Sequence, residues 1–286
     1  MLTSIKEILT KAQEGGYAVG AFNLSNMETA QGILMAAVER RSPLIVQITE
    51  STMKFAGAKE IAEITRTIIK ERSGDIPIGI NLDHGKTFEV AMRCIDLGFN
   101  GVMIDGSRLS FEENLNLTKR VVDYAHEKQV TVQAELGVVP YLGESDLSEV
   151  NWKDFMTDPE QARQFVEATG ADSLAIGIGN AHGFFRELEN CDWDRLAEIR
   201  EKIKIPLVIH GSSDWLEEKI IKAVEGGVSC FNVDTDLRLA FVHTLCQLTD
   251  DKCAITDPRN IMDAVRNAIK KKVIEKIHAY GSANKA

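Results

Sequence analysis

Short apolar runs alternate with longer amphipathic stretches along almost the whole chain of 286 residues. Most of the short runs are apolar throughout, which is typical of parallel strands covered on both faces, whereas the longer stretches place apolar residues at helical spacing. The pattern predicts eight strands, at residues 18–23, 44–49, 77–83, 101–105, 130–135, 173–178, 206–210 and 230–233.

Helices are predicted between these strands, among them 28–40, 111–128, 159–169 and 215–225. Glycines follow several of them, as at Gly98, Gly170 and Gly227, where a left-handed residue can end the helix and start the turn into the next strand. About eight strand–helix units without a linker predict a (β/α)8 TIM barrel that forms one domain over residues 1–286. A doubly wound sheet is the alternative, but the first strand lacks the glycine-rich phosphate signature of that fold.

Two segments lie outside the regular alternation. A final packing helix is predicted after the Asp-Pro-Arg motif at 257–259. The connection from Glu135 to the helix at Pro159 is unusually long, and long loops in compact domains are usually lids or binding loops, so we expect it to be mobile. Glu144 lies in this connection among other acidic residues, and from the residues alone it is best explained as a solvated acid.

Composition narrows the class of protein. Hydrophobic residues make up 44% and charged residues 27% of the chain, which is ordinary for a globular protein in water. The net charge of -10 argues against nucleic acid as a partner. No apolar run is long enough to span a bilayer, the N-terminus lacks the pattern of a signal peptide, and the five cysteines show no close paired spacing. We therefore expect a cytoplasmic protein without a membrane partner, a disulfide framework or a thiolate zinc cluster.

Three of the six histidines, His84, His182 and His210, end apolar runs and precede a glycine. Because the strands of a barrel all point the same way, these three side chains are expected to meet at one mouth. Three neutral imidazoles around one point fit a catalytic zinc site with an open fourth position. Each histidine alone is more simply explained as a strand cap bonded to a backbone carbonyl, but the shared pattern favours a metal.

Three carboxylates also end predicted strands: Asp83, Asp105 and Glu135. A buried carboxylate is costly unless it is paired or bound to a metal, so a cation beside the histidines would explain this cluster. Because His84 already fills the position of a ligand, we assign the neighbouring Asp83 to proton transfer.

Two stretches indicate phosphate binding. Residues 211–213 (GSS) follow the seventh predicted strand, and residues 232–235 (NVDT) follow the eighth. Barrels often bind phosphate with these two loops, through backbone N–H groups and small hydroxyls. Ordinary helix N-capping by Ser213 and Thr235 is the alternative, and both roles are compatible.

These motifs together resemble the class II, metal-dependent ketose-bisphosphate aldolases, which include fructose- and tagatose-bisphosphate aldolases. The likeness extends over nearly the whole chain, through 17–23 (YAVGAFN), 82–85 (LDHG), 98–105 (GFNGVMID), 134–137 (AELG), 157–159 (TDP), 179–183 (GNAHG), 210–211 (HG), 232–235 (NVDT) and 257–259 (DPR).

The resemblance implies a role for each polar residue at the mouth. The three histidines would hold zinc or another divalent metal, with a monovalent cation as a further candidate, and Asp105 and Glu135 would support them or provide an alternative metal position. Asp83 would exchange the proton on the C4 oxygen of a ketose. Glu144 would be the mobile-loop acid that handles the proton on the carbanion carbon.

The same resemblance implies a phosphorylated ketose as substrate and a homodimer or homotetramer. Arg259 would reach the second phosphate from a neighbouring subunit. The expected substrate-binding residues are Asn23, Thr49, Asn180, Gly183, Gly211, Ser213, Asn232, Asp234, Thr235 and Arg259.

The expected reaction is the reversible cleavage of a ketose bisphosphate to dihydroxyacetone phosphate and an aldehyde. Fructose 1,6-bisphosphate is the first choice, followed by tagatose 1,6-bisphosphate or a ketose 1-phosphate. The alternatives are a metal-dependent hydrolase on the same barrel and a sugar-phosphate-binding barrel without turnover. A lysine Schiff base is a rival route for aldol chemistry, but no predicted strand ends in lysine. Lys86 is expected on the first turn of a helix, where it caps surface charge or touches phosphate.

Overall fold

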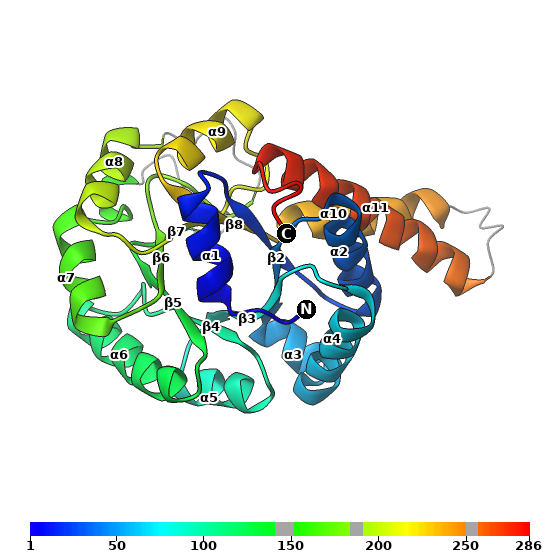
Figure 1. The fold of residues 1–286 in the computed structure, drawn as a ribbon, viewed down its shortest axis with the longest axis horizontal. Coiled ribbons are helices and arrows are strands. Elements are labelled where there is room, and N and C mark those ends of the chain that lie inside the picture. Colours follow the sequence, from blue (N-terminus) through cyan, green and yellow to red (C-terminus); the bar gives the residue numbers. More distant parts are fainter. Residues whose placement is uncertain (141–151, 184–190, 250–256) are drawn as a thin grey trace.

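Eight parallel strands close into a barrel in chain order, with the last strand paired to the first (Figure 1). The computed structural model describes residues 1–140, 152–183, 191–249 and 257–286. The strands are β1 (Val19–Asn23), β2 (Leu44–Thr49), β3 (Ile78–Gly85), β4 (Gly101–Ile104), β5 (Thr131–Leu136), β6 (Ser173–Ile176), β7 (Leu207–Ile209) and β8 (Val228–Val233). The predicted TIM barrel is therefore confirmed, with strand boundaries within two residues of those expected from the sequence.

Helices cover the outside of the barrel because each strand is buried on both faces and each connecting segment is amphipathic. Their starts are set by local capping: Ser110 and Glu113 form a reciprocal capping box. The helices of this layer are α2 (Met27–Arg40), α3 (Glu50–Ala56), α4 (Ala58–Arg72), α5 (Phe88–Asp96), α6 (Phe111–Glu127), α7 (Pro159–Thr169), α8 (Trp193–Lys202) and α9 (Glu217–Glu225), with a short 3-10 helix at Trp152–Asp154. Gly98, Gly170 and Gly227 have positive φ, as expected for the turns that follow helices.

Helix α1 (Ile5–Glu14) closes the N-terminal end of the barrel and lies across its centre in Figure 1. Its buried side chains join the cluster that fills the barrel interior, which includes Val19, Met103 and Val208. The fit is close, because a Cβ added to Gly79 would lie 2.5 Å from Cγ1 of Ile5. With this end filled, the carboxyl ends of the strands are left to form a site.

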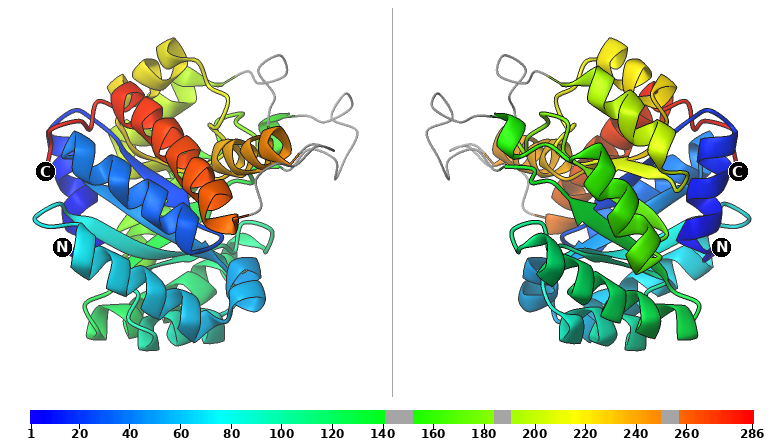
Figure 2. Two further views of the ribbon diagram at one scale, coloured as in Figure 1. Left: turned by 90° about the vertical axis from the view of Figure 1, so that its right-hand side faces the viewer. Right: turned by 90° about the vertical axis from the view of Figure 1, so that its left-hand side faces the viewer.

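Two helices follow β8: α10 (Thr235–Leu248) and α11 (Pro258–Ala279). Helix α11 packs against α2 and α10, and Figure 2 shows it running beside α2 along one flank of the barrel. Just after it, the Tyr280 ring stacks on Phe231 of β8 with 4.7 Å between the centroids. The predicted final packing helix is confirmed, and it is fixed to the strand that carries Asn232.

The long connection after β5 is described only at its two ends. Val138 N–H donates to the Phe155 carbonyl at 2.8 Å, so the ends of the loop lie close together. Glu144 belongs to residues 141–151, which lie outside the described residues.

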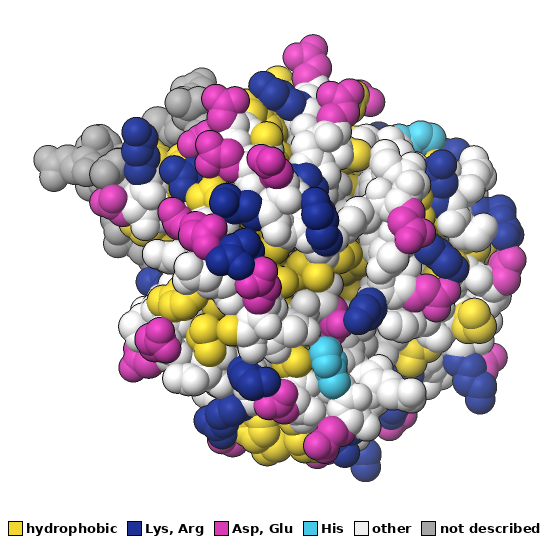
Figure 3. Space-filling view, turned by 60° about the vertical axis from the view of Figure 1, so that its left-hand side comes forward, with side chains coloured by type: hydrophobic (Ala, Val, Ile, Leu, Met, Phe, Trp, Pro, Cys, Tyr) yellow, Lys and Arg dark blue, Asp and Glu magenta, His cyan; other side chains and the backbone are white. Residues whose placement is uncertain are grey.

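No helix within the described ranges is long and apolar enough to cross a membrane. On the face shown in Figure 3, acidic and basic side chains are interspersed. The net charge of -10 is therefore not gathered into one acidic patch on that face.

Candidate metal and substrate site

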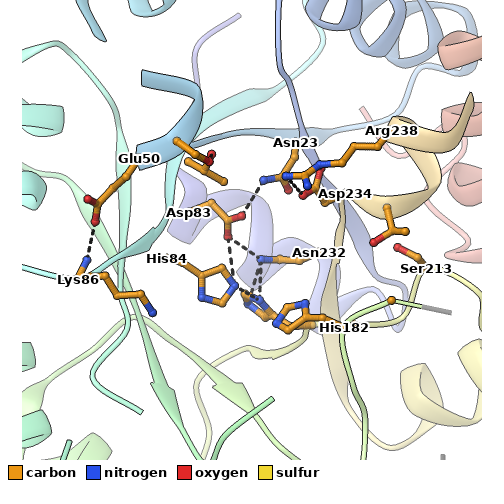
Figure 4. A pocket seen from close by; sticks show the side chains of 16 residues that line it. Asn23, Glu50, Asp83, His84, Lys86, His182, Ser213, Asn232, Asp234 and Arg238 are labelled. Carbon is orange, nitrogen blue, oxygen red and sulfur yellow. Dashed lines mark hydrogen bonds and ion pairs between the residues drawn. The ribbon is translucent and has the colours of Figure 1, made fainter. Parts of the chain in front are cut away.

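The three histidines predicted to converge do so at the carboxyl ends of the strands, and Figure 4 labels two of them, His84 and His182. His84 is the second-last residue of β3, His182 follows β6 and His210 follows β7. The ring of His84 is 5.4 Å from that of His182 and 4.8 Å from that of His210, measured between centroids. One ring nitrogen from each histidine lies within 4.8 Å of the other two, so the three nitrogens can bind the same metal ion.

His84 reaches this position through an irregular backbone. Its φ of 50° lies in the left-handed region, which residues other than glycine rarely adopt. The register between β3 and β4 also shifts between Leu82 and Gly85. The distortion lets His84 Nδ1 lie 2.9 Å from Asp105 Oδ2 while its Nε2 lies 3.1 Å from His210 Nδ1.

His210 is held from both its side chain and its backbone. The amide nitrogens of Gln133 and Asn232 lie 3.0 and 2.9 Å from His210 Nε2. Asn180 donates to the His210 carbonyl at 2.8 Å. The following Gly211, with φ 67°, passes so near the Ala181 carbonyl that an added Cβ would lie 2.2 Å from it. Position 211 therefore requires glycine, because any side chain there would clash with the backbone of Ala181.

The electrostatics separate His84 from the other two histidines. Burial alone would lower the pKa of His84, but the carboxylates of Asp83, Asp105 and Glu135 outweigh it and raise the pKa to about 9. Burial lowers the pKa of His182 to about 3, with the charge of His84 adding to the shift, and the same two causes lower the pKa of His210 well below its usual value. The carboxylates therefore favour a positive charge at His84, whether that charge is a proton or a metal ion. The other two imidazoles are neutral, which is the form that binds metals.

Asp105 carries the charge that orients His84. Burial alone would raise its pKa, but hydrogen bonds from His84, Lys86 and Ser107 hold that pKa well below the usual range. Glu135 behaves oppositely: burial and the nearby Asp105 raise its pKa to about 8. The predicted helical position of Lys86 is wrong, because Lys86 precedes α5 and its ammonium lies 2.5 Å from Asp105 Oδ2. Lys86 also lines the cavity, so its contact with phosphate stays a prediction. The contact with Asp105 was not predicted because it joins the loop after β3 to the residue after β4, and such a contact leaves no local signal in the sequence.

Asp83 is buried at the bottom of the cavity and accepts two hydrogen bonds from amides. Asn23 Nδ2 lies 2.7 Å from its Oδ2, and Asn232 Nδ2 lies 3.3 Å from its Oδ1. The nearest histidine nitrogen, Nε2 of His84, is 4.0 Å from Asp83 Oδ1. Asp83 therefore lies beside the histidine cluster without a hydrogen bond to it, and its role in proton transfer stays a prediction.

The donor set fits a metal ion. The distance of 3.1 Å between His84 Nε2 and His210 Nδ1 is near the separation of about 3.3 Å expected for two nitrogen ligands in tetrahedral zinc coordination. A second set, His84 with Asp105 and Glu135, is also compact enough to bind a cation. The two sets share His84, and the predicted roles of these carboxylates, as supports of the metal or as an alternative position for it, stay predictions.

Because Asp105 orients His84, Asp105→Asn is expected to lower metal affinity about 10- to 100-fold, the usual cost of losing the partner of a metal-binding histidine. Metal content measured after dialysis against graded chelator concentrations checks this. Asp172→Asn is the matched control, since Asp172 is a buried carboxylate bonded to His126 at the opposite end of the barrel. Equal metal retention in the two variants would contradict the role given to Asp105.

A cavity of about 510 Å³ opens above the histidines. Hydroxyl, amide and glycine groups line the side formed by the loops after β6, β7 and β8. Residues 49–51, at the end of β2 and the start of α3, line another side, where Figure 4 labels Glu50. The predicted substrate-binding residues on its walls are Asn23, Thr49, Gly183, Gly211, Ser213, Asn232, Asp234 and Thr235.

The alternative role of Ser213 and Thr235 as helix N-caps is wrong. Helix α9 begins at Glu217 with Leu216 at its N-cap, and α10 has Asp234 at its N-cap without a side-chain cap bond. Both hydroxyl residues instead line the cavity. Their side chains are therefore available to a ligand.

Two predicted substrate-binding residues lie outside the cavity lining. Asn180 is buried, accepts from Ile178 N–H and donates to the His210 carbonyl, so it positions the loop that carries His210. The Arg259 side chain is 88% exposed and pairs with Asp257 at the start of α11.

Sequence reasoning missed several residues of the site. Arg238 lines the cavity and forms an ion pair with Asp234 one helical turn away, at 2.6 Å. The spacing of four residues between this acid and base was a usable signal. Glu50 and Ser51 also line the cavity, whereas Gln133 at the base of His210 left no signal beyond its place in a strand.

A closed barrel with three histidines beside carboxylates at its open end defines a metal-dependent TIM-barrel enzyme. The family model described as "Fructose-bisphosphate aldolase class-II" matches residues 3–285. The chain belongs to this class II aldolase family and is therefore an aldehyde-lyase that acts on a phosphorylated sugar. Class II aldolases are metal-dependent and typically use zinc.

Individual relatives agree with this assignment. The chain is 38% identical to a fructose-bisphosphate aldolase of Geobacillus stearothermophilus over 286 residues, which is 100% of this chain and 99% of the relative. The crystal structure of the YdjI aldolase from Escherichia coli K12 is similar with a TM-score of 0.89 and 30% identity, and the match covers 100% of both chains. Family membership excludes the hydrolase considered from the sequence as the main alternative.

Proposed function

We propose that the protein is a zinc-dependent aldolase that reversibly cleaves the C3–C4 bond of a ketose phosphorylated at C1, giving dihydroxyacetone phosphate and an aldehyde. The observation that carries this proposal is the position of Asp83 at the base of the cavity, beside three convergent histidines. His84, His182 and His210 would hold the metal, and Asp105 and Glu135 would stabilise its positive charge.

The residues of the site would divide the reaction between them. When bound, the metal supplies Lewis-acid polarisation of the ketose carbonyl, an effect worth several kcal/mol. Asp83 takes the proton from the C4 hydroxyl as the C3–C4 bond breaks and returns it in the reverse direction. The amides of Asn23 and Asn232 keep the carboxylate of Asp83 aimed at that hydroxyl.

The electrons of the broken bond pass to C3, so the dihydroxyacetone phosphate half must receive a proton there. We assign this proton to Glu144, which lies outside the described residues, on the basis of its place in the long connection after β5. The phosphate of this half would lie against Gly183, Gly211 and the Ser213 hydroxyl on one side, and against Asn232, Asp234 and Thr235 on the other.

Fructose 1,6-bisphosphate is the first-choice substrate, and the name of the Geobacillus stearothermophilus relative supports this order. Tagatose 1,6-bisphosphate and ketose 1-phosphates follow. Arg259, exposed at the start of α11, is proposed to contact the second phosphate from a neighbouring subunit of a homodimer or homotetramer. The cytoplasmic location stays a prediction.

The experiment that tests this function is a coupled assay for triose phosphate across a panel of ketose mono- and bisphosphates. We expect fructose 1,6-bisphosphate to give the largest kcat/KM, with dihydroxyacetone phosphate as a product from every substrate that reacts. Turnover without release of dihydroxyacetone phosphate would contradict the proposal, and so would a complete lack of turnover by the zinc-loaded enzyme.

A further inference from the structure

A buried ammonium lies behind the loops that line the phosphate side of the cavity. Lys276, on α11, is the only lysine buried among the described residues. Its Nζ donates to the Ser213 carbonyl at 2.5 Å, and Oδ2 of Asp236 lies 2.7 Å from the same nitrogen. The side chains of Lys276 and Asp236 are each 10% exposed, so water screens this pair little.

The two partners of Lys276 come from different loops of the barrel. Ser213 belongs to the connection after β7, and Asp236 lies in the first turn of α10, after β8. Their neighbours Gly211 and Thr235 line the cavity, whereas Lys276 itself does not. A single side chain from the C-terminal helix therefore joins the two loops from outside the site.

This arrangement has two consequences for an anion in the cavity. The Ser213 carbonyl oxygen accepts a hydrogen bond from Lys276, which lies outside the cavity lining. This bond fixes the oxygen and offsets part of its negative charge, so it repels a bound phosphate less. The charge of Asp236 is balanced by the ammonium, so a buried carboxylate can sit next to the phosphate loops without an uncompensated negative charge.

We propose that Lys276 is a positioning residue for phosphate binding, which fixes the Ser213 carbonyl and neutralises Asp236 so that the loops after β7 and β8 accept the substrate phosphate. This inference rests on the proposed function, because it takes the phosphate to lie against Ser213 and Thr235. It adds a residue of α11 that never touches the substrate.

The test compares Lys276→Met with Lys272→Met, which removes a partly exposed lysine of the same helix that pairs with Glu275. For Lys276→Met we expect the inhibition constant of inorganic phosphate and the dissociation constant of dihydroxyacetone phosphate to rise about tenfold or more. The value of kcat at saturating substrate should change less than KM, because the chemistry takes place at the histidines. Lys272→Met should resemble the wild type in all of these measurements.

A second variant separates positioning from a general loss of stability. In Lys276→Met/Asp236→Leu the buried ion pair becomes an apolar pair, an exchange that proteins often tolerate without loss of stability. We expect a wild-type unfolding midpoint together with phosphate binding that is still weakened, because the Ser213 carbonyl has lost its donor. Wild-type phosphate binding in this double variant would overturn the proposal.

Ser213→Ala in the otherwise unchanged enzyme distinguishes an error in the proposed phosphate position from an error in the role of Lys276. Unchanged phosphate binding in Ser213→Ala would show that phosphate lies elsewhere, which is a failure of the proposed function. Weakened binding in Ser213→Ala together with wild-type binding in Lys276→Met would refute the role of Lys276 alone.

Discussion

Removal of divalent metal with a chelator is expected to lower the aldolase rate at least about a thousandfold, since several kcal/mol of transition-state stabilisation depend on the metal and each 1.4 kcal/mol is a factor of ten. Zinc added back should restore the rate. The fold should remain intact, because the barrel core and α1 are packed without any contribution from the site. The rate, the bound metal and the circular dichroism of the same samples check these expectations.

The matched variant is His210→Ala, which should lose bound zinc and should not recover when zinc is added. Treatment with borohydride in the presence of substrate tests for the rival mechanism, a lysine Schiff base, which borohydride would trap as a covalent adduct. The one lysine lining the cavity among the described residues, Lys86, has its ammonium on Asp105, so no covalent adduct is expected. An adduct that inactivates the enzyme would favour a Schiff base over the metal.

The fold was predictable because its signals are local and repeat. Each strand is a short run buried on both faces, and the predicted strand at 44–49 coincides with β2. The convergence of His84, His182 and His210 followed from a single further step, since the ends of parallel strands in a barrel meet at one mouth. No knowledge of side-chain contacts was required for either result.

The parts that escaped prediction depend on contacts between distant elements. The pair of Lys86 with Asp105 and the pair of Lys276 with Asp236 each join segments that are adjacent only in the fold. The start of α9 shows the same limit. The helix begins at Glu217 and not at the predicted residue 215. Trp215 is instead buried against Phe231 of β8, with ring centroids 6.2 Å apart.

Replacement of Asp83 by asparagine is expected to lower kcat for cleavage about 10²- to 10⁴-fold, the usual contribution of a positioned general acid or base. Asparagine keeps the shape of the side chain and can still accept a hydrogen bond from Asn23, but it cannot take the proton from the C4 hydroxyl. Metal content should stay at the wild-type level, because Asp83 lies 4.0 Å from His84 Nε2 and belongs to neither candidate donor set. Steady-state kinetics and metal analysis of the purified variant check both expectations.

Proton exchange separates this role from a purely structural one. Exchange of the C3 proton of dihydroxyacetone phosphate with solvent requires the metal and the acid proposed at Glu144, but it does not require transfer at the C4 oxygen. Asp83→Asn should therefore retain exchange while losing cleavage, and the control Asp172→Asn should retain both, since Asp172 lies at the closed end of the barrel. Loss of exchange together with cleavage, at unchanged metal content, would mean that Asp83 shapes the whole site. Retention of both exchange and cleavage would mean that a group other than Asp83 takes the proton from the C4 hydroxyl.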